Sequence, residues 1–268
     1  MGGRGSGSGM SLGAGGGSGG GIAPQQQQQQ RQAPQQQQQQ VNLQPGSQLQ
    51  TNAQASATLS QIMSMSDDQL AQAVKDSRNV DMPNFLNDKP DPTQKFVYQV
   101  GLNGAPTVMD QAQFDQFMKQ NNIPQSNILS RSVNGNGPYT ANHIADIFRY
   151  SELNYIGGKH GGMMSGAGTY FDMNGGRNTG YGSGATLKAV LNPQTARVID
   201  YYALKRQATA FAKSHPKFVQ AVGGMPTNGQ GGNMSVWALA MGYNVISGGP
   251  VSSTYHNIID RSAVIVLK

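Results

Sequence analysis

A low-complexity stretch at the start of the chain limits how much of it can fold. Residues 1–57 contain a Gly/Ser tract and two glutamine runs, at 25–30 and 35–40. This composition offers almost no apolar surface to offset the entropy lost on folding, so we expect a disordered tail. About 210 of the 268 residues remain, which suits one domain with a hydrophobic core, preceded by a short helical segment.

Charge and cysteine content exclude several classes of protein. The formal net charge is +6, but only 12% of the residues are charged and no basic helix carries interleaved aromatic residues. This pattern argues against a direct nucleic-acid partner. Cysteine is absent, which excludes disulfides, thiolate metal sites and a cysteine nucleophile. The four histidines show no metal-ligand spacing, so we expect no metal site.

Hydropathy gives no sign of a membrane or secretory segment. The sequence has no run of about 18 apolar residues, so we expect no transmembrane helix. The N-terminus also lacks the apolar core of a secretory signal peptide. We therefore expect no secretion by a signal peptide, and the absence of cysteine fits an intracellular or virion protein.

The first part of the foldable region predicts helices separated by linkers. Order should begin near Ala57, and a short amphipathic helix follows the capping residue Ser66. Residues 79–92 contain three prolines and indicate a linker. Residues 93–102 place apolar side chains at helical spacing, and residues 110–118 begin with a capping aspartate and present an apolar face. Both segments are predicted helices.

The second part is richer in strands. Residues 127–133 are short, apolar and bounded by turn residues, which predicts a buried strand that carries Arg131. A buried arginine is costly without an anionic partner, so Arg131 either binds an anion or lies at the solvent end of the strand. Helices first and many short strands later predict an α+β fold. Further strands are expected over residues 187–191, 196–201, 243–246 and 256–266, and further helices over 140–150, 204–211 and 235–242.

A glycine-rich stretch, residues 157–172, is the candidate binding site. It ends in the β-formers Thr169-Tyr170-Phe171-Asp172. A glycine-rich turn exposes backbone N–H groups to a ligand, and the strand after it can hold an aromatic ring at the edge of a pocket. The alternative is a flexible loop before an ordinary hairpin, with Tyr170 and Phe171 alternating between surface and core.

The order of these pieces resembles the ADP-ribosyltransferase fold. An arginine-bearing strand precedes Gly-x-Gly-x-Tyr-Phe at residues 166–171, a strand closed by Asn192-Pro193, and Ala-x-x-x-Gly-Tyr-Asn-Val-Ile at residues 238–246. The chain looks most like the ADP-ribosyltransferase-like proteins of bacteriophages and prophages, where a Met-Gly-Gly-Arg-Gly start and a Thr-Gln-Lys-Phe-Val-Tyr segment also recur. The resemblance covers residues 93–268 and implies a split β-sheet core behind a helix and linker at residues 58–92.

The resemblance also implies roles for individual residues. Arg131 stands where the Arg-Ser-Glu transferases have arginine, and would bind the phosphates or ribose of NAD through its planar guanidinium. Tyr170 would stack on nicotinamide. Further NAD-binding candidates are His160, Ser165, Gly166, Gly168, Thr169 and Tyr181.

The sequence departs from the family at its third catalytic element. The family has a glutamate near the start of a late strand, whereas this chain contains a single glutamate, Glu152, and Asp260 is the only acid of the terminal strand. The resemblance makes Asp260 or Glu152 the candidate that stabilises the cation formed as nicotinamide leaves. Alternatively, Asp260 pairs with Arg261 or ends the strand.

The resemblance implies a phage-encoded, NAD-dependent ADP-ribosyltransferase. NAD would be its substrate, a host protein would accept the ADP-ribose, and the enzyme would work in the virion or the host cytoplasm. A competing hypothesis is a virion-associated structural or interaction protein that binds other virion proteins and keeps the fold without catalysis. A third is a nucleic-acid modifier that uses the same fold.

Overall fold

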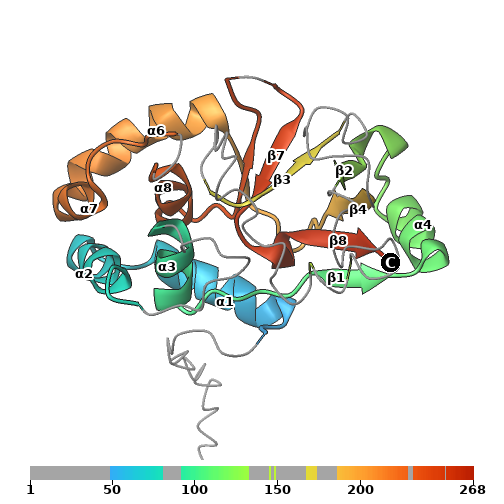
Figure 1. The fold of residues 1–268 in the computed structure, drawn as a ribbon, viewed down its shortest axis with the longest axis horizontal. Coiled ribbons are helices and arrows are strands. Elements are labelled where there is room, and N and C mark those ends of the chain that lie inside the picture. The colour runs from blue at the N-terminus through green and yellow to red at the C-terminus, as the bar shows by residue number, and fades with distance from the viewer. Residues whose placement is uncertain are drawn as a thin grey trace, which may run out of the picture. The chain divides into compact units, whose positions relative to one another are not determined.

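One mixed sheet of eight strands organises the computed structural model (Figure 1). The structure describes residues 49–80, 92–132, 145, 148, 167–173, 186–228, 232–250 and 252–268. The expected tail up to residue 48, and residues 81–91 of the linker expected over 79–92, lie outside the described residues. Pro92, which the sequence pattern assigns to that linker, is the first residue of helix α3 (Pro92–Gln99). In spatial order the strands are β1 (Thr107–Met109), β8 (Val264–Leu267), β4 (Thr186–Leu191), β2 (Leu129–Ser132), β3 (Thr169–Asp172), β7 (Tyr255–Ile258), β6 (Val245–Ser247) and β5 (Val198–Asp200).

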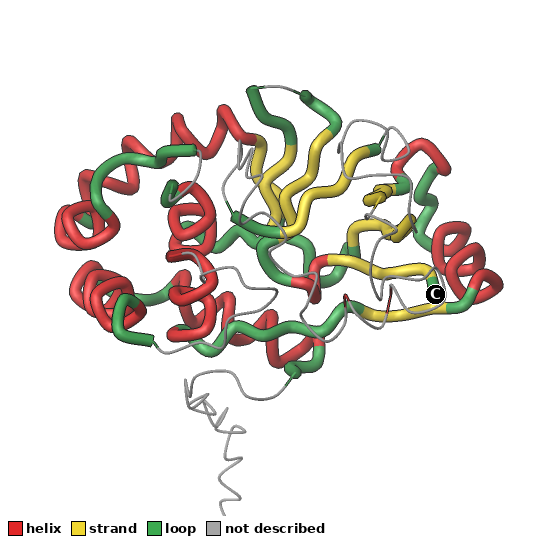
Figure 2. The backbone as a smooth tube through the Cα atoms, viewed as in Figure 1, coloured by secondary structure: helices red, strands yellow, loops and turns green. Residues whose placement is uncertain are grey.

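Helices gather at both ends of this sheet (Figure 2). Helix α4 (Gln111–Gln120) packs against β8 and β1, whereas most other described helices gather at the opposite end of the molecule. Helix α1 (Asn52–Met63) runs between the two edges, because Asn52 bonds to Thr107 of β1 and Ser60 bonds to Arg197 beside β5. No helix in the described parts of the chain combines the length and the apolarity needed to cross a membrane. The remaining helices are α2 (Asp67–Ser77), α6 (Tyr201–Ser214), α7 (Pro216–Val222) and α8 (Met234–Ala240). The mixed α+β class predicted from the sequence is confirmed.

Capping residues fix where the first helices begin. Ser66, Thr51 and Asp110 each accept a hydrogen bond from a backbone N–H in the first turn, and a glutamine three positions later bonds back to each cap. The prediction of a helix after Ser66 is confirmed. The expected start of order near Ala57 is too late, because Thr51 starts α1 at Asn52.

The single terminal strand predicted over residues 256–266 is wrong, because Asp260 divides it into β7 and β8. The buried Asp260 carboxylate accepts hydrogen bonds from Gly104 N at 2.9 Å and from the Ser262 hydroxyl. A 3₁₀ turn at Arg261–Ala263 follows it. The two strands then occupy different places in the sheet, since β7 pairs with β3 and β6 whereas β8 pairs with β1 and β4.

Strand register separates the side chains into two faces of the sheet. Ser130 pairs with Asp172 and Asn257 with Tyr170, so these residues share one face, because directly opposed strand residues point the same way. Arg131 and Phe171 lie on the other face. The face that carries Arg131 and Phe171 holds one apolar cluster. The Tyr170 face packs against α4 through Val190 and Ile265, and against α8 through Ile246. The cluster on the Phe171 face includes Leu129, Phe148, Leu187, Val245, Ile258, Val264 and Val266.

Asp260 should make the folded state less stable as pH rises. Burial raises the pKa of the Asp260 carboxyl above its ordinary value of 3.8. A carboxyl with a higher pKa in the folded state holds its proton more tightly when folded, so the free energy of unfolding falls as pH rises from about 4 through the raised pKa. Denaturant unfolding measured across this pH range should show a smaller fall in the free energy of unfolding for Asp260→Asn than for the wild-type protein.

The matched control is Asp115→Asn, which changes an exposed carboxylate on α4. The free energy of unfolding of Asp115→Asn should depend on pH as that of the wild-type protein does. An Asp260→Asn variant with the same pH dependence as the wild type would contradict this role for Asp260.

Candidate functional site

Arg131 and Tyr170 meet at the centre of the sheet. Arg131 lies on β2 and its Nη1 donates a hydrogen bond to the backbone carbonyl of Tyr170 on β3, at 2.8 Å. The arginine side chain is only 1% exposed, so it does not lie at the solvent end of its strand. A charge-assisted bond of this kind fixes the position of β3 and of the aromatic ring that follows the glycine turn.

The turn before β3 is held by contacts with α8 and β7. Ser235 Oγ on α8 donates to the carbonyl of Ala167 at 2.6 Å, and Asn257 Nδ2 donates to the same carbonyl at 3.3 Å. Gly168 has φ +156°, and a Cβ there would lie 2.0 Å from Asn257 Oδ1 and 2.7 Å from the carbonyl of Ile258. Glycine is therefore required at this position so that the turn can approach β7 closely.

A polar and aromatic group occupies the face of β3 and β7 that carries Tyr170. The half-buried Tyr170 ring lies edge-on to Tyr255, with ring centroids 6.5 Å apart. Asp172 projects from the same face of β3, is fully buried, and pairs in register with Tyr255 and Ser130. An aromatic ring beside a buried carboxylate is an arrangement suited to a flat, cationic ligand.

Sequence reasoning missed Asp172, Tyr255 and Asn257 as members of this group. The signal for Asp172 was present, because residues two apart on a strand point to the same face and Asp172 follows Tyr170 at that spacing. Tyr255 and Asn257 show the same spacing on β7. Their pairing with β3 joins segments about 85 residues apart, which no local pattern specifies.

His256 lies on the opposite face, in register with Phe171. Burial lowers the pKa of His256 below its ordinary value of 6.5, so the ring is neutral at pH 7. Its Nδ1 lies 3.1 Å from the carbonyl of Thr254, which assigns the ring proton to Nδ1 and leaves Nε2 as an acceptor.

The structure does not bring Asp260 to the Tyr170 group. Its carboxylate bonds to Gly104 N and to the Ser262 hydroxyl, and none of its hydrogen bonds or ion pairs among the described residues joins it to Arg131 or Tyr170. Asp260 directly follows β7 and Ile259, so it closes that strand, as the alternative interpretation held. Thr169 is buried on the Phe171 face, in register with Ile258. The other candidates, Glu152, His160, Ser165, Gly166 and Tyr181, lie outside the described residues.

Comparison with family models, curated proteins and solved structures found no match for this chain. Within the described residues, no group of three or more His, Cys, Asp or Glu side chains is placed to hold a metal ion. The site is therefore interpreted from its own geometry. Gly168 precedes β3, Tyr170 and Tyr255 form an aromatic pair on β3 and β7, Asp172 is a buried carboxylate, and Arg131 bonds to the Tyr170 carbonyl.

Replacing Gly168 should test how tightly the turn is held. The Cβ of Gly168→Ala would overlap Asn257 and the Ile258 carbonyl, so we expect a loss of at least about 2 kcal/mol in the free energy of unfolding. Gly223→Ala is the matched control, because Gly223 has φ +88° but a Cβ there would meet nothing within 4 Å.

The control should lose only the backbone cost of about 1 kcal/mol. Chemical denaturation of both variants measures the difference. Equal losses in the two variants would show that close approach to β7 does not constrain the turn.

Proposed function

We propose that this chain is a phage-encoded enzyme that cleaves NAD at the nicotinamide bond and transfers ADP-ribose to a host protein. The observation that carries the proposal is the placement of Arg131 on β2 beside Tyr170 on β3, directly after the glycine turn. The resemblance to the ADP-ribosyltransferase fold implies this order of an arginine-bearing strand and a nicotinamide-stacking tyrosine. The Arg131 side chain, however, is buried on the opposite face of the sheet from the Tyr170 ring, so in this proposal it supports β3 and does not bind the NAD phosphates or ribose.

The course of the sheet supports the same proposal. Strands β3 and β7 run in a clearly different direction from β8 and β1 (Figure 1). The division of the terminal segment at Asp260 places β7 in one part of the sheet and β8 in the other. A sheet whose two parts diverge in this way is compatible with the split core of the ADP-ribosyltransferase fold, with Tyr170 near the junction.

In this proposal the described residues have distinct tasks. Tyr170 offers a half-buried ring on which nicotinamide would stack. Arg131 positions that ring through the Tyr170 carbonyl. Asp172, on the same strand face, would supply negative charge near the cation that forms as nicotinamide leaves, acting through the local field because its carboxylate is buried. Catalysis would then depend on positioning and on charge stabilisation.

A second candidate is a virion-associated interaction protein that keeps this fold without catalysis. The observation that favours it is the position of Asp260, the acid that the sequence offered for the terminal strand. Its carboxylate is bonded to Gly104 and Ser262 in a buried site. In that case the chain would bind other virion proteins, and NAD would be bound weakly or not cleaved.

Nicotinamide release from NAD distinguishes the two candidates. The full chain is incubated with NAD, and free nicotinamide is measured by liquid chromatography. We expect release above background, with a fall of at least about tenfold in Tyr170→Ala, because stacking on an aromatic ring contributes about 1–3 kcal/mol. Tyr202→Ala is the control, since Tyr202 is 53% exposed on α6 and away from this group.

Release that is absent from the wild-type protein would contradict the enzymatic proposal. Release that is equal in Tyr170→Ala and Tyr202→Ala would instead contradict the assignment of the site. Circular dichroism of both variants checks that they remain folded. Labelled NAD incubated with host extract then identifies the acceptor, with label on protein expected and label on DNA or RNA pointing to the nucleic-acid modifier.

A further inference from the structure

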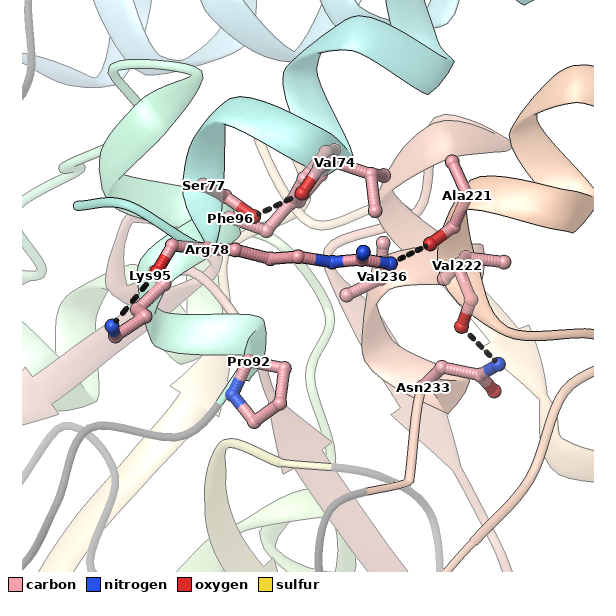
Figure 3. Close-up of a pocket in the computed structure, with 10 residues that line it drawn as sticks. All are labelled: Val74, Ser77, Arg78, Pro92, Lys95, Phe96, Ala221, Val222, Asn233 and Val236. Carbon is pink, nitrogen blue, oxygen red and sulfur yellow. Dashed lines mark hydrogen bonds between the residues drawn. The ribbon is translucent and has the colours of Figure 1, made fainter.

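A second site lies among the helices at the β5 end of the sheet. A pocket of about 400 Å³ opens where α2, α3, α7 and α8 meet (Figure 3). Its walls are largely apolar, with Val74 from α2, Phe96 from α3 and Val236 from α8. None of its lining residues belongs to β2, β3 or β7, so it is distinct from the Tyr170 group.

Two cationic side chains line this apolar pocket. Arg78 lies extended across it from the end of α2, and its Nη2 donates to the carbonyl of Ala221 on α7 at 2.5 Å (Figure 3). Lys95 Nζ, from α3, donates to the backbone carbonyl of Arg78 at 3.3 Å. No acidic side chain is among the described residues that line the pocket.

Neither cation is neutralised by a described carboxylate. Among the described residues the salt bridge is the exposed pair Lys217–Asp68, which joins the N-terminal ends of α2 and α7, whereas the pocket lies at their C-terminal ends. Both cations of the pocket donate only to backbone carbonyls in the described part of the chain. A guanidinium has five N–H donors in a planar fork, so Arg78 retains donors for an anionic ligand.

We propose that this pocket binds a small amphipathic anion, with an apolar body and one carboxylate group. The body would pack against Val74, Phe96 and Val236, and the carboxylate would bond to Arg78 beside the Lys95 ammonium. The volume lies within the range of small-molecule sites, where a mostly apolar wall is combined with a few polar groups that fix orientation. The proposal does not depend on NAD chemistry at the Tyr170 group.

Trp237 provides a built-in reporter for this pocket. It is the single tryptophan of the chain, it follows the pocket residue Val236, and it is fully buried. Its indole N–H donates to the carbonyl of Gly224 at 3.2 Å, in the segment that follows α7. A ligand that fills the pocket should change the surroundings of this ring and hence its fluorescence.

The probe is 4-phenylbutyrate, which combines an aromatic body with a carboxylate, titrated into the full chain with excitation of tryptophan alone. We expect a saturable fluorescence change. Acetate, which lacks the apolar body, and 4-phenyl-1-butanol, which lacks the charge, should each bind at least about tenfold more weakly. A response to the alcohol as strong as to the carboxylate would overturn the anionic character of the site.

Substitutions then locate the response. Arg78→Gln and Lys95→Gln should each raise the Kd of the probe, with Arg78→Gln raising it about tenfold or more. Lys119→Gln, an exposed cation on α4 at the other end of the sheet, should leave it unchanged. Thermal unfolding of each variant checks the fold, and Lys95→Gln keeps the test decisive if Arg78→Gln unfolds.

An equal Kd for Lys95→Gln, Lys119→Gln and the wild-type protein would place the probe outside this pocket. That result would overturn the proposal.

Discussion

The close pairing of β3 with its neighbours is the constraint on which the site depends. Gly168 lets the turn before β3 approach Asn257 more closely than any side chain would allow, and Ser235 fastens the same turn to α8. On the other side, Arg131 holds the carbonyl of Tyr170. These contacts fix one face of β3, and the Tyr170 ring and the Asp172 carboxylate keep their positions because the backbone between them cannot shift.

A second buried carboxylate, Asp260, shapes the rest of the sheet. Burying this acid is costly, and the cost is offset by the Gly104 N–H and the Ser262 hydroxyl. Gly104 has no Cβ, and one placed there would lie 2.6 Å from Asp260 Oδ1. The resulting turn separates β7 from β8. The residue that the family resemblance suggested for catalysis therefore acts in the described contacts as a structural anchor.

Local patterns predicted the elements better than their connections. The caps at Ser66 and Asp110, the buried strand with Arg131 and the strand after the glycine turn all follow from nearby residues. The sequence pattern did not predict β1 or α7. Strand β1 has three residues and helix α7 has seven, so each is too short to show a clear hydrophobic period. The division at Asp260 depends on Gly104, which lies 156 residues away in sequence. The Tyr170 ring was predictable, whereas its neighbours on β7 required the sheet order.

The central claim is that the Tyr170 ring receives nicotinamide. The most direct measurement is a crystal structure of the full chain with a non-hydrolysable NAD analogue. The account predicts the nicotinamide ring stacked on Tyr170, near the Asp172 side of β3. A nicotinamide ring bound away from β3, or a chain that binds no analogue at concentrations that saturate NAD-dependent transferases, would contradict it.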